Sequence, residues 1–125
     1  MIKRFVIGFI LLGIVVPALA LPGEVIIGQQ LVLRIRFPAG GFTVQERVDA
    51  VTLRLNELLG SKPFDPSDVT VGVRNKEYVV LMGDKVIVTA DEDTAKFNKA
   101  TPQQLAEKWA ANLRRVIPKA KSEVR

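Results

Sequence analysis

The sequence predicts an α+β domain built as a two-layer structure, with one antiparallel sheet of about four strands and two main helices on one face. Several short segments alternate apolar and polar residues, which is typical of strands with one buried face. Two longer segments instead repeat their apolar residues at helical spacing, each behind a capping motif. The resulting order is β-α-β-β-β-(short α)-α, and an antiparallel sheet covered by helices is the natural solution for it.

The chain begins with a segment typical of a signal peptide. Two positive residues precede an apolar run, Pro17 interrupts it, and Ala18-Leu19-Ala20 places small residues before a cleavage point. Residues 1–20 are therefore expected to be removed, and the protein is expected to be extracytoplasmic, either periplasmic or secreted. The alternative is that residues 5–21 anchor the chain to the inner membrane, although a spanning helix needs about 20 apolar residues.

The first structural element is an extended segment over residues 24–37. Its stretch LVLRIRF alternates, so that Val32, Arg34 and Arg36 are expected to face away from the core. Gly28 is expected to break or bulge this segment.

A helix is predicted over residues 43–59. Thr43 and Glu46 form a capping box at its start, and Gly60 is a favourable residue just after its end. A loop with two prolines follows, and then three short strands that form a meander, with turns at Asn75-Lys76 and Gly83-Asp84.

Two helices complete the domain. Asp91 is expected to cap a short one, and Thr101 begins a second capping box for a long one that Pro118 is expected to end. The single domain therefore spans residues 21–118, and residues 119–125 are expected to form a disordered basic tail. The expected core consists of Leu33, Ile35, Val48, Val51, Leu55, Leu58, Val71, Val80, Ile87, Leu105, Trp109 and Leu113.

Composition restricts the function. The formal charge is +5, but most of it lies at the two ends, so the central domain carries only about +1. This distribution and the export segment argue against a nucleic-acid partner. The chain has no histidine and no cysteine, which excludes catalytic triads, disulfides and a cysteine-linked lipid anchor. We expect no enzymatic activity and no cofactor; a small hydrolase is the less favoured alternative.

An anion-binding face is one candidate site. Arg34, Arg36 and Arg74 would project from the open face of the predicted sheet, where arginines can hold the carboxylates or phosphates of wall polymers and lipid headgroups. The competing explanation is that arginines are ordinary on a solvated sheet face.

A metal site is a second candidate, at Asp91, Glu92 and Asp93, because hard cations prefer oxygen ligands. Acidic residues in a first helical turn more often cap free N–H groups. A third candidate is a partner surface around Leu53, which lies opposite the apolar stripe of its helix. It would be strengthened if Val32 and Val79 were also exposed.

Four segments, GQQLVLRIR, GFTVQERVDAVTLRLNELL, VIVTADEDTA and TPQQLAEKWAANLRRVIP, resemble the small extracytoplasmic domain that precedes the membrane part of some bacterial mechanosensitive ion channel proteins, notably of cyanobacterial type. The matching positions are Gly28, Leu31, Glu46, Arg47, Arg54, Leu55, Thr89, Asp93, Ala95, Leu105, Ala106, Trp109, Ala110, Leu113 and Arg114. The chain departs from the family at Thr94, which separates an aspartate and an alanine that are adjacent in the family. No pore-lining segment follows Pro118, so the resemblance implies the extracytoplasmic module without the channel, and it implies no catalytic residues.

The sequence therefore predicts an exported, non-enzymatic binding or assembly module of the bacterial cell envelope, accessory to a membrane protein if the resemblance holds. Its expected partner is an envelope protein or a cell-wall polymer, or a second copy of the chain. Contact with the membrane is expected only through residues 5–21, if they are not cleaved.

Overall fold

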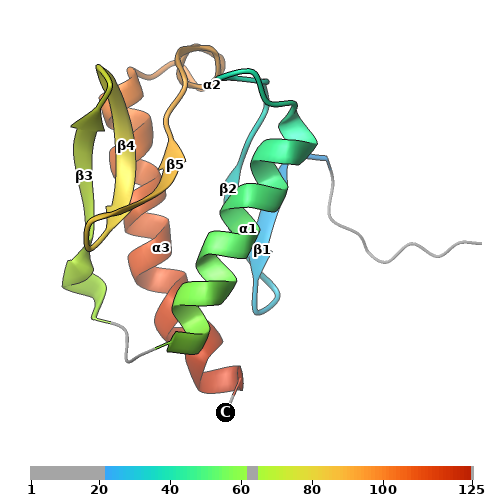
Figure 1. Ribbon diagram of the computed structural model, residues 1–125, viewed down its shortest axis with the longest axis vertical. Helices are drawn as coiled ribbons and strands as arrows, with labels where there is room; N and C mark the ends of the chain where they lie inside the picture. The colour runs from blue at the N-terminus through green and yellow to red at the C-terminus, as the bar shows by residue number, and fades with distance from the viewer. Residues whose placement is uncertain (1–21, 62–64, 125) are drawn as a thin grey trace, which may run out of the picture.

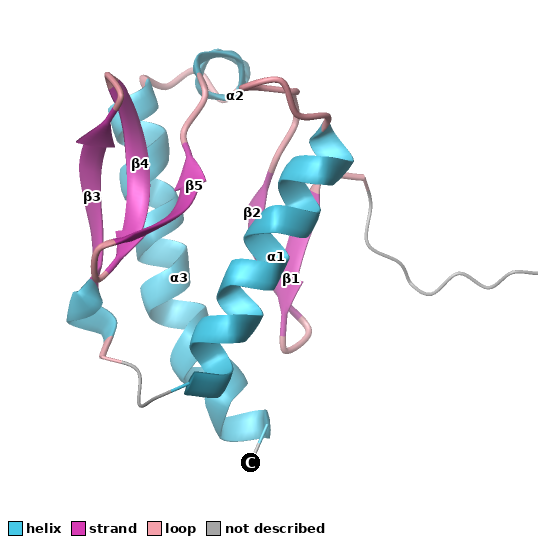
Figure 2. Ribbon diagram, in the orientation of Figure 1, coloured by secondary structure: helices cyan, strands magenta, loops and turns pink. Residues whose placement is uncertain are grey.

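The computed structural model describes residues 22–61 and 65–124, which fold as an α+β domain (Figures 1 and 2). The predicted signal segment, residues 1–20, lies outside the described residues. Among the described residues, no helix combines the length and apolar character that crossing a membrane requires. The elements, in chain order, are β1 (Glu24–Ile27), β2 (Gln30–Arg34), α1 (Val44–Ser61), the 3₁₀ turn η1 (Pro66–Asp68), β3 (Val69–Arg74), β4 (Glu77–Met82), β5 (Lys85–Thr89), α2 (Glu92–Phe97) and α3 (Pro102–Val124).

The strands form two antiparallel sheets, so the prediction of one sheet of about four strands is wrong. One sheet is the hairpin β1-β2, and the other is the meander β3-β4-β5. The helices consequently do not cover one face of a common sheet. In Figure 1, α3 runs behind the meander while α1 lies in front of the hairpin. Helix α3 contacts β2, β3 and β4, and α1 contacts β1 and β5.

The extra hairpin arises at Gly28 and Gln29. Both residues have positive φ, +56° and +67°, the conformation that a two-residue hairpin turn requires. The predicted long extended segment therefore folds back on itself. As a result, β2 pairs with β1, whereas in a single sheet it would pair with a strand of the meander.

A bulge in this hairpin changes which side chains are buried. Val25 pairs with Leu33 and Ile26 pairs with Leu31, so Val32 is an extra residue in its strand. Because a bulge interrupts the alternation of side chains, Val32 and Leu33 are both buried, whereas Leu31 is 45% exposed. The prediction that Val32 faces away from the core is wrong for this reason.

The structure confirms the other predicted elements, except that α1 continues to Ser61, so Gly60 lies inside the helix and not just after its end as predicted. Asn75 and Lys76 have positive φ and turn the chain between β3 and β4, and Gly83 begins the turn between β4 and β5. Thr43 and Glu46 cap α1 reciprocally, at 3.1 Å from Glu46 N to Thr43 Oγ1 and 2.9 Å from Thr43 N to Glu46 Oε1. Thr101 and Gln104 make the same pair of contacts at the start of α3.

Helix α3 does not end at Pro118 as predicted; its backbone remains helical to Val124, across most of the expected disordered tail. A proline removes one N–H donor and crowds the preceding turn, but the residues after it keep their own donors. The buried residues Val116 and Ile117 hold the turn before Pro118 against the core, so the helix continues past it.

One hydrophobic core joins both sheets and the helices. Most of the predicted core residues are buried in it, and Val48, Leu58 and Val71 pack on it while partly exposed. Helix α3 contacts both sheets through a buried stripe centred on Leu105, Trp109 and Leu113. This stripe holds the layers together, a role that one continuous sheet was expected to have.

Candidate functional site

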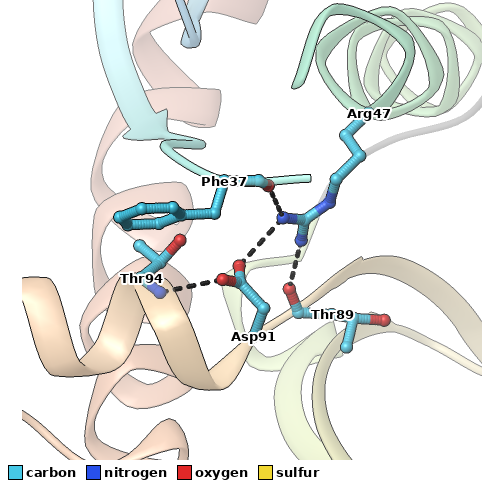
Figure 3. A network of polar contacts seen from close by, with 5 residues as sticks. All are labelled: Phe37, Arg47, Thr89, Asp91 and Thr94. Atoms are coloured by element: carbon cyan, nitrogen blue, oxygen red, sulfur yellow. Dashed lines mark hydrogen bonds and ion pairs between the residues drawn. The ribbon is translucent and has the colours of Figure 1, made fainter. Parts of the chain in front are cut away.

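A buried arginine joins three segments of the chain (Figure 3). Arg47 Nη1 donates to Phe37 O at 2.7 Å and to Asp91 Oδ1 at 2.9 Å, and Nη2 donates to Thr89 O at 2.9 Å. Asp91 Oδ2 in turn accepts the backbone N–H of Thr94 at 2.8 Å, which caps α2. We call this network the Arg47 clasp. It ties α1 to the segment after β2, the end of β5 and the start of α2.

The clasp accounts for one residue of the predicted metal cluster. Both carboxylate oxygens of Asp91 are occupied by the clasp, while Glu92 and Asp93 are exposed in the first turn of α2. The described part of the chain holds no group of three or more acidic, histidine or cysteine side chains placed to bind a metal ion. Asp91 therefore acts as a structural residue in this fold.

A groove of about 260 Å³ lies between β2 and α3, and we call it the basic groove. Four cationic side chains, Arg34, Arg36, Lys108 and Arg115, are among its lining residues, and no carboxylate is. The other lining residues are Leu31, Val32, Leu33, Asn98, Leu105, Trp109 and Asn112. Positive charge is thus concentrated at one place on a domain whose overall charge is small.

Helix α3 supplies one wall of the basic groove. Lys108, Asn112 and Arg115 are spaced at i, i+4 and i+7, so they share one helical face. Asn112 Nδ2 donates to Val32 O, the carbonyl of the bulged residue, at 3.0 Å. Arg115 Nη2 donates to Asn112 Oδ1 at 3.1 Å. Asn112 therefore fixes the helix face to β2 and holds Arg115 over the groove.

Strand β2 and the residues after it supply the opposite wall. Arg34 forms an ion pair with Glu24, its cross-strand neighbour, although its Nε is buried without a hydrogen-bond partner. The guanidinium of Arg36 stacks on the Phe97 ring, 4.3 Å from the centroid. Phe37 meets the same ring edge-on, with centroids 6.1 Å apart. Stacking leaves the N–H edges of the Arg36 guanidinium available for an anion.

The structure separates the other predicted site residues from this groove. Arg74 lies on β3, in the other sheet, where its Nη1 donates to the neighbouring carbonyl of Val73. Leu53 is 60% exposed on α1, but Val32 and Val79 are buried, so the wider apolar surface that they would have formed is absent among the described residues.

A second groove, of about 190 Å³, lies between α1 and the edge of β5. Arg47 and Arg54 line it together with Glu46 and Glu77, so its charges are mixed. Arg54 Nη1 donates to Ile87 O at 3.0 Å, and this arginine is therefore already engaged with the sheet edge.

A hydrolase could draw its nucleophile from Ser61 or Ser67, which lie beside and within the predicted loop with two prolines. Ser67 donates its backbone N–H and its hydroxyl to Asp65 Oδ1, at 3.0 and 2.9 Å. These two hydrogen bonds hold the pKa of Asp65 below its ordinary value, the backbone contact contributing most. Ser67 lines neither groove, and Ser61 lies at the end of α1 with a side chain outside the described set.

Sequence reasoning identified Arg34 and Arg36 but missed Lys108 and Arg115. The polar stripe of α3 could have revealed them, because Lys108, Asn112 and Arg115 run beside its apolar stripe. The strand that faces this polar stripe is determined by the hairpin turn at Gly28, and the sequence alone did not show that the chain turns there.

A family model described as "Domain of unknown function (DUF8459)" matches residues 24–120, from the start of β1 into the last turns of α3. Comparison with the curated proteins and with the solved structures found no match. The matched range contains every strand and the whole basic groove.

Proposed function

The chain belongs to the DUF8459 family, and we propose that it is a non-enzymatic binding module that holds an anionic ligand in the basic groove. The observation that carries this proposal is the lining of that groove, with four cationic side chains and no carboxylate. Guanidinium groups bind carboxylates and phosphates through paired N–H donors, so these are the ligand groups that the groove fits.

Three of the four cations are available to a ligand. Among the described residues, Arg34 is the only one of them that forms an ion pair; Arg36, Lys108 and Arg115 have no carboxylate partner. Repulsion among clustered like charges raises the free energy of the unliganded domain, and a bound anion reduces this repulsion. The cluster therefore favours a binding role over a purely structural one.

The lining residues also support the absence of catalysis. They include no serine, threonine, tyrosine, aspartate or glutamate, so the groove contains neither a hydroxyl nucleophile nor a carboxylate general base.

Residues 1–20 support a location outside the cytoplasm, where the ligand would be a component of the cell envelope and the module could assist a membrane protein. Recovery of the full-length chain, with Met1 attached, from the cytosol would contradict this location.

A titration of the full chain with inorganic polyphosphate tests the site. Trp109 lines the groove and is the only tryptophan, so its fluorescence should report binding. Arg36→Ala and Arg115→Ala are expected to weaken binding about fivefold or more each, because each removes a charge-assisted hydrogen bond. Binding should also weaken as salt concentration rises.

Arg74→Ala is the matched control, because it removes an equally cationic, exposed side chain from the other sheet. It is expected to leave the affinity unchanged. Equal losses from all three substitutions would mean that polyphosphate responds to overall charge, and the groove would not be the site.

A further inference from the structure

We propose that the basic groove and the exposed apolar residues beside it form a face that docks on an anionic lipid bilayer. This inference rests on the proposed anion binding and specifies its ligand as lipid headgroup phosphates. The sequence predicted membrane contact through residues 5–21 and named lipid headgroups only as one class of anion for an open sheet face, so a docking face that combines the groove with exposed apolar residues is an addition.

Three partly exposed apolar side chains lie in the groove or next to its lining residues. Leu31 lines the groove and is 45% exposed, and its cross-strand partner Ile26 is 39% exposed. Directly opposite residues of an antiparallel pair share one face of the sheet, so these two form a continuous patch. Phe97, 57% exposed, lies under the Arg36 guanidinium.

Cations mixed with exposed apolar side chains are the arrangement that binds the boundary between headgroups and acyl chains. The cations are attracted to anionic headgroups, and the apolar residues enter the layer beneath. A soluble anion or a wall polymer would use Arg36, Lys108 and Arg115 but would leave Ile26 and Leu31 in water. The combination therefore favours a bilayer over either of these ligands.

If residues 5–21 stay in place as an anchor, the path of the chain holds this face near a membrane. Arg34 in the groove pairs with Glu24 at the start of β1, and Ile35 N donates to Gly23 O at 2.7 Å. In the sequence, the apolar run ends at Leu21, three residues before Glu24. Three extended residues span only about 10 Å. If residues 5–21 anchor the chain, the groove is held close to the headgroups; if they are removed, the face has the contacts to bind by itself.

The chain contains no cysteine, so single-cysteine labelling can test the docking face in the full chain. Leu31→Cys carries a polarity-sensitive fluorophore beside the groove. Leu53→Cys carries the same label on α1, where the replaced leucine is also exposed but lines neither groove. Each protein is mixed with phosphatidylcholine vesicles, with or without phosphatidylglycerol.

We expect the label at Leu31→Cys to shift to shorter emission wavelengths, and to be quenched by a lipid-borne quencher, only with vesicles that contain phosphatidylglycerol. The label at Leu53→Cys should not respond, even if residues 5–21 insert. Adding Arg36→Ala or Arg115→Ala to Leu31→Cys should weaken the vesicle response about fivefold each, whereas adding Arg74→Ala should not.

Equal responses at the two label positions, a response with neutral vesicles, or no response at Leu31→Cys would each overturn the docking face. The polyphosphate titration separates this outcome from failure of the proposed function. If polyphosphate binding depends on Arg36 and Arg115 but the vesicles give no selective response, the groove binds a different anion and only the lipid inference falls. If both experiments fail, the anion site falls as well.

Discussion

Replacement of Arg47 by alanine is expected to destabilise the fold by about 3–5 kcal/mol, the usual cost of removing one partner of a buried ion pair. The side chains of Arg47 and Asp91 are only 8% and 7% exposed, and their atoms approach to 2.9 Å. Without Arg47, the Asp91 carboxylate stays buried with one backbone N–H as its remaining donor. The carbonyls of Phe37 and Thr89 also lose the donor that they share.

The size of this effect follows from how many groups depend on one side chain. Arg54→Ala is the matched control, because Arg54 also lies on α1 and donates to a β5 carbonyl, but makes one such contact and no ion pair. Its expected cost is about 0.5–1.5 kcal/mol. Since whole domains are stable by about 5–15 kcal/mol, Arg47→Ala should remove a large fraction of the total and Arg54→Ala a small one.

A double-mutant cycle isolates the ion pair. Asp91→Asn keeps an oxygen that can cap α2 but removes the buried negative charge. Combined with Arg47→Ala, it should cost clearly less than the sum of the single substitutions, because the uncompensated charge is gone. Urea unfolding, followed by circular dichroism and by the fluorescence of the single tryptophan, gives each free energy. If Arg47→Ala costs no more than Arg54→Ala, or if the two sites are additive, the clasp does not stabilise the fold as argued.

Three further substitutions test the fold. Gly23→Ala should cost at least about 2 kcal/mol, because Gly23 has φ +87° and a Cβ there would lie 2.1 Å from Ile35 O; a urea midpoint equal to that of the unsubstituted chain would contradict this. Leu113→Ala should cost about 2–5 kcal/mol, because Leu113 is fully buried in the core; thermal unfolding measures it, and a loss below 1 kcal/mol would contradict the packing. Asp65→Asn should lower stability slightly at neutral pH, because the pKa of Asp65 is depressed by its hydrogen bonds from Ser67. A depressed pKa stabilises the fold above the ordinary aspartate pKa of about 3.9 and ceases to do so as pH falls through the folded value. The difference between variant and unsubstituted chain should therefore shrink on acidification, and a urea-midpoint difference that grew would have the wrong sign.

The elements that were predictable from the sequence are those with local causes. The capping pairs Thr43–Glu46 and Thr101–Gln104 depend on residues three apart, and they form as predicted. The meander was also predictable, because its turns are two residues long and its strands are short segments rich in β-branched residues. In each case the structure is determined by residues only a few positions apart in the sequence.

The sheet arrangement was not predictable, because it depends on contacts between distant segments. Gly28 could break the first strand, bulge it or turn it, and the sequence alone does not decide among these. Once the chain turns there, the bulge at Val32 reverses the exposure of Leu31 and Val32. The alternating pattern thus predicted the correct element, but it placed Leu31 and Val32 on the wrong faces, whereas Leu33 and Ile35 are buried as predicted.

The same reason limits what the sequence said about the site. Arg34 and Arg36 were found because alternation places them on one strand face. Lys108 and Arg115 join them only because α3 packs across β2, a contact between residues about 80 positions apart, as in the hydrogen bond from Asn112 to Val32. Net charge concealed the groove, since acidic residues elsewhere on the domain offset its four cations.

Side chains, and not further strands, complete the two small sheets. The unpaired carbonyls of Ile87 and Thr89 on β5 accept from Arg54 and Arg47 of α1, and that of Val32 on β2 accepts from Asn112 of α3. Exposed sheet edges promote pairing with other chains, and occupied carbonyls reduce that risk. These same contacts fix α1 and α3 against the strands. The amide of Asn112, which satisfies the bulged carbonyl, also positions Arg115 in the basic groove. Protection of a sheet edge and assembly of the anion site therefore depend on one residue, Asn112.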